Sequence, residues 1–464
     1  MLKSRLKLTS AIAVAALIGC TSVAVDTYGP FPVTVKGYDG DTTNSVSYSG
    51  QIARQVLHDS LKKLAQTGNG GTNAAQVEAQ MLAYFDGSDK VLPIIAPTSK
   101  DGFPIRQKTV NEISTGKKIS NKFYNGVMPA WPGNQSGVDV ARQMIKFAAA
   151  SNQGYDAVNG YDWAQLISKF TLGAMMYNQA VDNYLDEKLE ADVKPNNKPY
   201  SRGKPYTGKE HSWDEAFGYF GAAAHSASLT PEQNYGIAKR KDFAAADANK
   251  DGVVDLKSEM VFGPAYYAAG ADKSGKTQYM NTIFNAYRAG RALLAEANGE
   301  ALTNAERAEL KGYAAVIESN WEKVMAEAIF KYAGSVYKDI EKLKSGKNPA
   351  KALRKYVKHW GELKGFTMAI QSGKKNLGMA IHDVNWLVGY GPAMPDGRMV
   401  SGIDANGHFI RDDKMSLEEY QVNMLKVQKL MIDTFGVKAR ANDATANLAA
   451  LAEKLGSHES AETD

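Results

Sequence analysis

The chain has 464 residues, of which 44% are hydrophobic and 23% charged, so it can bury a sizeable core and does not have the composition of a disordered protein. A single cysteine excludes a disulfide-linked scaffold. The formal net charge is +5, but Lys3, Arg5 and Lys7 belong to the leader discussed next. The rest lacks the concentrated basic charge of a nucleic-acid-binding protein, and no nucleic-acid partner is expected.

The first 19 residues have the composition of a secretion signal. A basic start, MLKSRLK, precedes an apolar run of about 12 residues, which is too short to cross a bilayer as a stable helix. Leu-Ile-Gly then precedes Cys20, a pattern that resembles a bacterial lipobox. We predict a signal peptide at 1–19 and a mature chain that is held in a lipid bilayer by several acyl chains on Cys20. The alternative is an ordinary signal peptide followed by a chance cysteine.

The residue after this cysteine bears on localisation. Thr21, where an Asp would retain a lipoprotein at the inner membrane, resembles the sorting pattern for the outer membrane. We therefore predict an outer-membrane lipoprotein that faces the periplasm or the cell surface. Residues 20–46 mix Gly, Pro, Asp and Thr with short β-favouring runs, which predicts a tether.

From Ser47 onward apolar residues recur at spacings of three and four, the pattern of amphipathic helices. The strongest pattern predicts a long core helix from Gly160 to Tyr184. Loop-rich stretches lie at about 87–135 and at 190–209, where Pro and Gly interrupt any regular element. The predicted helices occupy 47–65, 75–85, 160–184, 211–225, 275–297, 304–344, 350–373, 376–389, 417–435 and 444–455.

Strand patterns are confined to 399–403 and 408–410, joined through Asn406-Gly407, which predicts one short β-hairpin. Ser416 and Glu419 have the spacing of a capping box and predict the start of the helix at 417–435. The predicted fold class is therefore all-α.

Two distant segments, 213–219 and 360–366, share the pattern W-x-E-x-x-G-aromatic, each with a histidine just upstream. Two helical bundles related by internal duplication would produce such a pair, because each bundle needs a glycine for close helix approach and an aromatic residue for packing. We predict a first helical bundle at 47–240 and a second at 241–464, which also contains an EF-hand-like loop.

Five polar residues of these two segments form a candidate transition-metal site. His211, Asp214 and Glu215 share one face of a helix, and imidazole together with carboxylates suits iron or zinc. One helical turn supplies at most three ligands, so His359 and Glu362 are expected to supply the rest. The alternative is structural: the acidic residues of a first turn interact with the helix dipole, and the histidine packs or caps.

Residues 247–259 have the pattern of a calcium-binding loop, with oxygen-bearing side chains at alternate positions and Gly252 at the turn. Ser258 stands where the usual bidentate Glu is found, and the acid follows one residue later, so a slightly longer loop is needed. The predicted calcium ligands are Asp247, Asn249, Asp251, Val253, Asp255 and Glu259. We predict an ion that stabilises a junction; the alternative is an Asn/Asp/Gly turn without an ion.

Four blocks, at 45–54, 210–222, 247–263 and 359–371, resemble the uncharacterised bacterial lipoprotein family called domain of unknown function 4856. A more distant resemblance is to imelysin-like proteins, helical double-bundle envelope lipoproteins linked to iron or haem acquisition, whose hallmark is G-x-H-x-x-E. Here Gly208 lies one residue farther from His211, and Asp214 takes the place of the Glu. The resemblance implies two packed helical bundles and an iron or haem ligand.

These observations predict a non-enzymatic, membrane-anchored binding lipoprotein that acquires iron or haem, with calcium as a structural cofactor and an outer-membrane transporter as a partner. One alternative is a calcium-stabilised structural or interaction lipoprotein without a transition-metal site. A second is a hydrolase in which Glu215 and His211 act as acid and base.

Overall fold

The computed structural model describes residues 27–87, 91–375, 377–451 and 453 of the chain. Cys20 and the predicted signal peptide at 1–19 lie outside these residues. Within them the fold is predominantly α-helical with a few two-residue strands, which confirms the predicted class. None of the described helices combines the length and the apolar character needed to cross a membrane.

The helices, and then the strand pairs, occur in the following order along the chain. The helices are α1 (Ser49–Leu64), α2 (Ala74–Phe85), α3 (Gly137–Ala150), α4 (Trp163–Thr171), the π-helical η3 (Leu172–Tyr184), α5 (Gly208–Phe220), α6 (Pro231–Ala238), α7 (Phe243–Ala246), α8 (Gly263–Asp272), α9 (Tyr279–Glu296), α10 (Asn304–Lys344), α11 (Pro349–Ala369), α12 (Met379–Val388) and α13 (Leu417–Phe435). The antiparallel strand pairs are β1 (Tyr155–Asp156) with β2 (Tyr161–Asp162), β3 (Arg398–Met399) with β6 (Asp413–Lys414), and β4 (Gly402–Ile403) with β5 (Phe409–Ile410).

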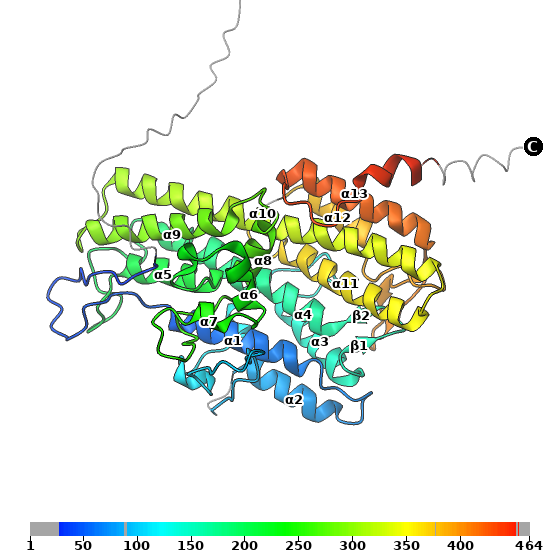
Figure 1. Ribbon diagram of the computed structural model, residues 1–464, viewed down its shortest axis with the longest axis horizontal. Coiled ribbons are helices and arrows are strands. Elements are labelled where there is room, and N and C mark those ends of the chain that lie inside the picture. Colours follow the sequence, from blue (N-terminus) through cyan, green and yellow to red (C-terminus); the bar gives the residue numbers. More distant parts are fainter. Residues whose placement is uncertain (1–26, 88–90, 376, 452, 454–464) are drawn as a thin grey trace, which may run out of the picture.

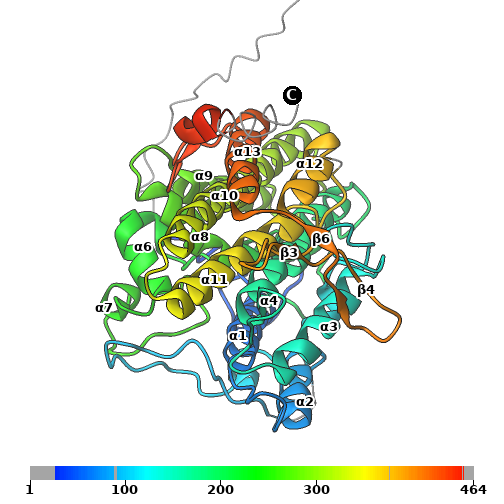
Figure 2. The same cartoon turned by 90° about the vertical axis from the view of Figure 1, so that its right-hand side faces the viewer.

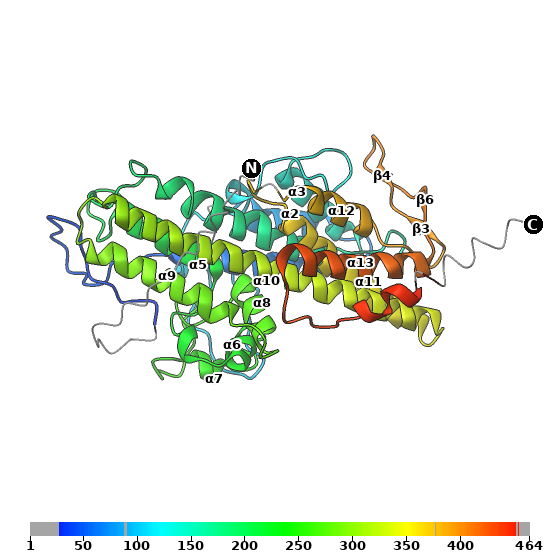
Figure 3. The same ribbon diagram turned by 90° about the horizontal axis from the view of Figure 1, so that it is seen from above.

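Helix α10 is the longest element and runs along the long axis of the molecule (Figures 1 and 3). Its 41 residues begin at a capping box made by Thr303 and Glu306, and at about 1.5 Å per residue it spans about 60 Å. Helices α9, α11 and α13 all pack against it. Helix α11 in turn packs on α4, as Figure 2 shows end-on, so the helix contacts cross the boundary that we predict near residue 240.

Two local predictions are confirmed, and one is corrected. The capping box of Ser416 and Glu419 begins α13, and β4 and β5 form the expected hairpin. The predicted helix at 160–184 forms in two parts, because α4 ends at Thr171 and continues as the π-helix η3. At this change of helix type, a Cβ on Gly173 would lie 2.2 Å from the carbonyl oxygen of Ala369, so the glycine allows α11 to approach this closely.

The two W-x-E-x-x-G-aromatic segments lie in α5 and α11, and their glycines have the same packing role. A Cβ on Gly218 would lie 2.7 Å from the Cβ of Gln51 in α1. A Cβ on Gly365 would lie 2.5 Å from the Cβ of Lys169 in α4. Each glycine therefore marks the point where its helix crosses a neighbour at close range, which is the role that the repeated pattern predicts.

A fully buried ion cluster joins the N-terminal segment 27–46 to the helices. Arg291 of α9 donates to Glu210 at 2.9 Å and to Asp214 at 3.1 Å, and all three side chains are completely buried. The hydroxyl of Tyr28 also donates to Asp214, at 2.7 Å. Segment 27–46, which we predict as part of a tether, thus packs against α5 through buried polar contacts.

Replacing Arg291 tests how much this cluster contributes to stability. Arg291→Met leaves two carboxylates buried without a cation, so we expect a loss of about 3–5 kcal/mol in the free energy of unfolding, measured with urea. The control is Lys311→Ala, which removes an exposed pair with Glu190 and should cost less than about 1 kcal/mol. Equal, small losses in both variants would contradict a structural role for the cluster.

Candidate functional site

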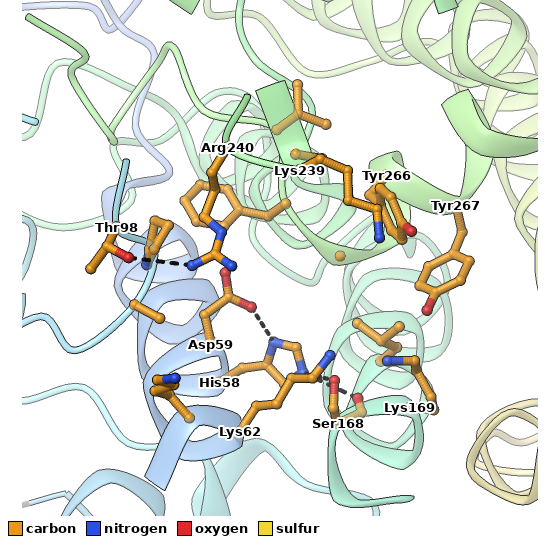
Figure 4. A pocket seen from close by; sticks show the side chains of 18 of the residues that line it. His58, Asp59, Lys62, Thr98, Ser168, Lys169, Lys239, Arg240, Tyr266 and Tyr267 are labelled. Atoms are coloured by element: carbon orange, nitrogen blue, oxygen red, sulfur yellow. Dashed lines mark hydrogen bonds and ion pairs between the residues drawn. The ribbon is translucent and has the colours of Figure 1, made fainter. Parts of the chain in front are cut away.

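A cavity of about 450 Å³ lies between α1, α4, the end of α6, α8 and the loop at 95–100 (Figure 4). Its most unusual property is its charge. Six cationic side chains but only two carboxylates line it: Lys62, Lys63, Lys100, Lys169, Lys239 and Arg240, with Asp59 and Glu362. The lining therefore has a formal excess of four positive charges in a partly enclosed space.

Two of these lysines face each other across the floor of the cavity. Lys169 is only 3% exposed, and its ammonium group donates to the neutral side chain of Gln165 at 3.1 Å. The ammonium group of Lys62, which belongs to α1, points toward the nitrogen of Lys169 (Figure 4). Burial lowers the pKa of Lys169 well below its ordinary value, and the charge of Lys62 lowers this pKa further. An anion between the two would remove this repulsion.

A second group of cations stands at the opposite side, at the end of α6. Arg240 has a left-handed backbone, with φ of 62°, and its guanidinium donates to Thr98. The charge of Arg240 is the main cause that lowers the pKa of Lys100. The ammonium of Lys239 lies 4.9 Å over the ring of Tyr266. Arg240 therefore holds an unfavourable backbone conformation beside cations that repel one another.

His58 and Ser168 complete the wall between α1 and α4. The Nε2 atom of His58 lies 3.0 Å from the hydroxyl of Ser168 and 3.1 Å from its carbonyl oxygen, and Nδ1 lies 3.2 Å from Asp59. With its proton on Nε2, the ring donates to the carbonyl and ties the two helices together. In that tautomer Nε2 cannot accept a proton from the serine.

The structure does not bring the five predicted transition-metal ligands together. His211 and Glu215 are neighbours, at 3.8 Å, whereas Asp214 belongs to the ion cluster with Arg291. His359 contacts Asp339, and Glu362 accepts a hydrogen bond from Tyr332 at 3.2 Å. No group of three or more His, Cys, Asp or Glu side chains suited to a metal ion occurs among the described residues.

The reason is that each acidic residue of the two segments has a partner of its own. Glu215 accepts from Gln51 of α1 at 2.8 Å, and Glu362 lies 4.0 Å from Lys358. The spacing along each helix is the expected one, but α5 packs mainly on η3 and also on α1, whereas α11 packs mainly on α10 and α4. The convergence of the two turns on one ion, which the sequence analysis expects, therefore has no geometric support.

The loop at 247–259 is closed by its own acidic side chains. Asp247 accepts the backbone N–H groups of Asp251 and Gly252 at 3.1 and 2.9 Å. The side chain of Glu259 crosses the loop and accepts hydrogen bonds from the backbone N–H groups of Ala248 and Asp255, at 3.1 and 2.7 Å. This is the wrapped backbone that a calcium loop needs.

The ion pairs of Arg106 with this loop would compete with a bound calcium ion. The guanidinium of Arg106 is paired with Asp251 and lies 3.7 Å from Asp255. Asn249 contacts Asp251 at 3.1 Å and is exposed. The oxygen-rich side chains fit calcium chemically, but an ion that uses Asp251 and Asp255 has to displace Arg106.

Comparison with known proteins places the chain in a family without adding a function. The family model described as "Domain of unknown function (DUF4856)" matches residues 37–384, a range that contains every residue of the cavity lining. This confirms the first of the two resemblances. No curated protein and no solved structure matches the chain.

Proposed function

We propose that this chain, which belongs to the DUF4856 family, is a binding lipoprotein of the cell envelope whose ligand is a small, multiply charged anion. The observation that carries the proposal is the excess of basic side chains in the cavity, above all Lys62, which faces the buried nitrogen of Lys169. Cations that repel one another at a concave site are stabilised by an anion that contacts several of them.

The size and walls of the cavity limit the ligand. A volume of about 450 Å³ suits a metabolite-sized molecule rather than a polymer. Tyr266 and Tyr267 supply an aromatic wall, and Leu172 and Phe262 supply apolar surface beside the cations. A compact ligand with two or more carboxylate or phosphate groups matches this combination.

The location and the wider role follow the sequence analysis. We propose attachment to the outer membrane through acylated Cys20, facing the periplasm or the surface, and delivery of the bound ligand to an outer-membrane transporter without chemical conversion. We propose that iron would be acquired as an anionic chelate, whose carboxylates bind the lysines of the cavity. The haem ligand and the hydrolase based on Glu215 and His211 stay predictions.

Calorimetric titration with phosphate, citrate and ferric citrate tests the proposal directly. We expect binding to the full-length protein in low salt, and a loss of affinity of about tenfold or more in the Lys62→Met variant, because one direct charge contact is worth about 1.4 kcal/mol. The control is Lys146→Met, since Lys146 is exposed on α3 and lies outside the cavity lining. Absence of binding for all three anions, or equal affinity in both variants, would overturn the proposal.

A calcium-stabilised scaffold is the second candidate function, favoured by the way Glu259 closes the loop. We propose that a calcium ion in this loop holds the junction between α7 and α8. At about millimolar calcium the unfolding temperature should then rise by several degrees.

The effect should disappear in Asp247→Asn, because Asp247 stands at the first ligand position. Asp404→Asn is the matched control, since Asp404 caps a similar Asx turn that lacks the later acids. An identical rise in all three proteins would show a nonspecific salt effect and contradict calcium binding at this loop.

A further inference from the structure

We propose that Lys169 holds carbonyl-bearing anions covalently, as a Schiff base with its side-chain nitrogen. The ligand class is a small oxo acid with two carboxylates, or an aldehyde that carries a phosphate group, so that the ligand is multiply charged. This inference rests on the proposed function, because the surrounding cations are what brings the anion to Lys169. It also narrows the ligand of that function to anions with a carbonyl group. An inorganic anion would occupy only the place of the ligand's charged groups.

The position of Lys169 is the first argument. It lies in the last turns of α4, where its side chain enters the cavity wall below Tyr267 and opposite Lys62 (Figure 4). Its hydrogen-bond acceptor, Gln165, is neutral, and no carboxylate lies within ion-pair distance of its nitrogen among the described residues. A cavity of ligand size thus ends at an amine that is not locked in a salt bridge.

The surrounding charges are the second argument. A lysine attacks a carbonyl only as the free amine, and burial or a like-charged neighbour favours that form. Lys62 faces Lys169 from α1, and Lys358 of α11 acts in the same direction. The carboxylate of Glu362 on α11 opposes them. Burial raises the pKa of Glu362, and Lys169 is the charge that lowers it most. Burial lowers the pKa of Lys169 most, and the two lysines add to this effect.

The chemistry balances without an added oxidant or reductant. The nitrogen of Lys169 bonds to the carbonyl carbon, and one amine proton moves to the oxygen to give a carbinolamine. The C–O bond then breaks, the second amine proton leaves with the oxygen as water, and C=N replaces C=O. The imine takes up a proton from solvent, and the Glu362 carboxylate, which also lines the cavity and interacts with Lys169, stabilises the resulting charge. Addition of water reverses every step and releases the ligand.

Lys364 provides a matched comparison within the same chain. It is also buried, and burial lowers its pKa to about 7. Its nitrogen, however, donates to the carbonyl oxygen of Gly389 at 2.6 Å, and Lys364 does not line the cavity. Lys169 and Lys364 are both buried lysines with a lowered pKa, but only Lys169 lines the cavity. A difference in reactivity between them would therefore be due to the cavity and not to burial alone.

The test is reductive trapping. The full-length protein is incubated with 2-oxoglutarate, a dicarboxylate with a ketone, treated with sodium borohydride, and digested for peptide mapping by mass spectrometry. We expect the reduced adduct at Lys169, with at least about tenfold less at Lys364 and at the exposed Lys146. In Lys62→Met, the amine of Lys169 is more fully protonated, so trapping near neutral pH should fall by about tenfold.

A second measurement separates this inference from the proposed function. 2-Hydroxyglutarate has the same two carboxylates as 2-oxoglutarate but no ketone, so it should compete for binding and leave no adduct. If the anions bind in the cavity while 2-oxoglutarate leaves no preferential adduct at Lys169, the Schiff base is wrong and the binding proposal stands. If neither binding nor trapping occurs, both are wrong. Because the adduct is mapped on the wild-type protein, the test does not depend on whether a variant of Lys169 folds.

Discussion

A positive charge buried in a protein needs a partner, because the loss of hydration costs more than packing alone returns. This protein satisfies that constraint within the chain at one place and leaves it unsatisfied at another. Arg291 is completely buried, and two carboxylates surround it. Lys169 is almost as buried, yet its nearest acceptor is a neutral amide and its facing neighbour is another lysine.

The two environments have different consequences. The cluster at Arg291 is closed, and it holds segment 27–46 against α5 and α9, so it contributes to the fold. The cavity at Lys169 holds like charges that the fold alone does not neutralise, so it lowers stability in return for a site. Such a trade between stability and function is common where a ligand supplies the missing interaction. The close crossing of α11 on α4 at Gly365 fixes the backbone of Lys169 in place beside the cavity.

Local signals in the sequence predict much of the fold. The capping box at Ser416 and the turn at Asn406-Gly407 depend on neighbouring residues only, and both are confirmed. The predicted elements do not include α3, although Ser136 caps this helix and accepts a hydrogen bond from the backbone of Asp139. Helix α8, which begins with Gly-Pro, is also absent from the predicted elements; packing against α6, α9 and α10 stabilises it.

The site was harder to predict than the fold. Lys62, Lys169 and Arg240 come from three segments, and each by itself has the pattern of a solvated surface charge. The spacing of His211 and Glu215 correctly indicated one helix face, but spacing does not show which helix packs opposite. That pairing depends on glycines such as Gly218 and Gly365, whose contacts are known only from the tertiary structure. The repeated motif thus predicted helix crossings and gave no information on the cavity beside them.

The central claim is that the cations of the cavity share an external anion. Crystals of the protein soaked in selenate, a doubly charged oxyanion with an anomalous scatterer, test this most directly. The account predicts an anomalous peak within hydrogen-bond distance of the nitrogens of Lys62 and Lys169. A cavity without such a peak, in crystals whose exposed lysines do bind selenate, would contradict it.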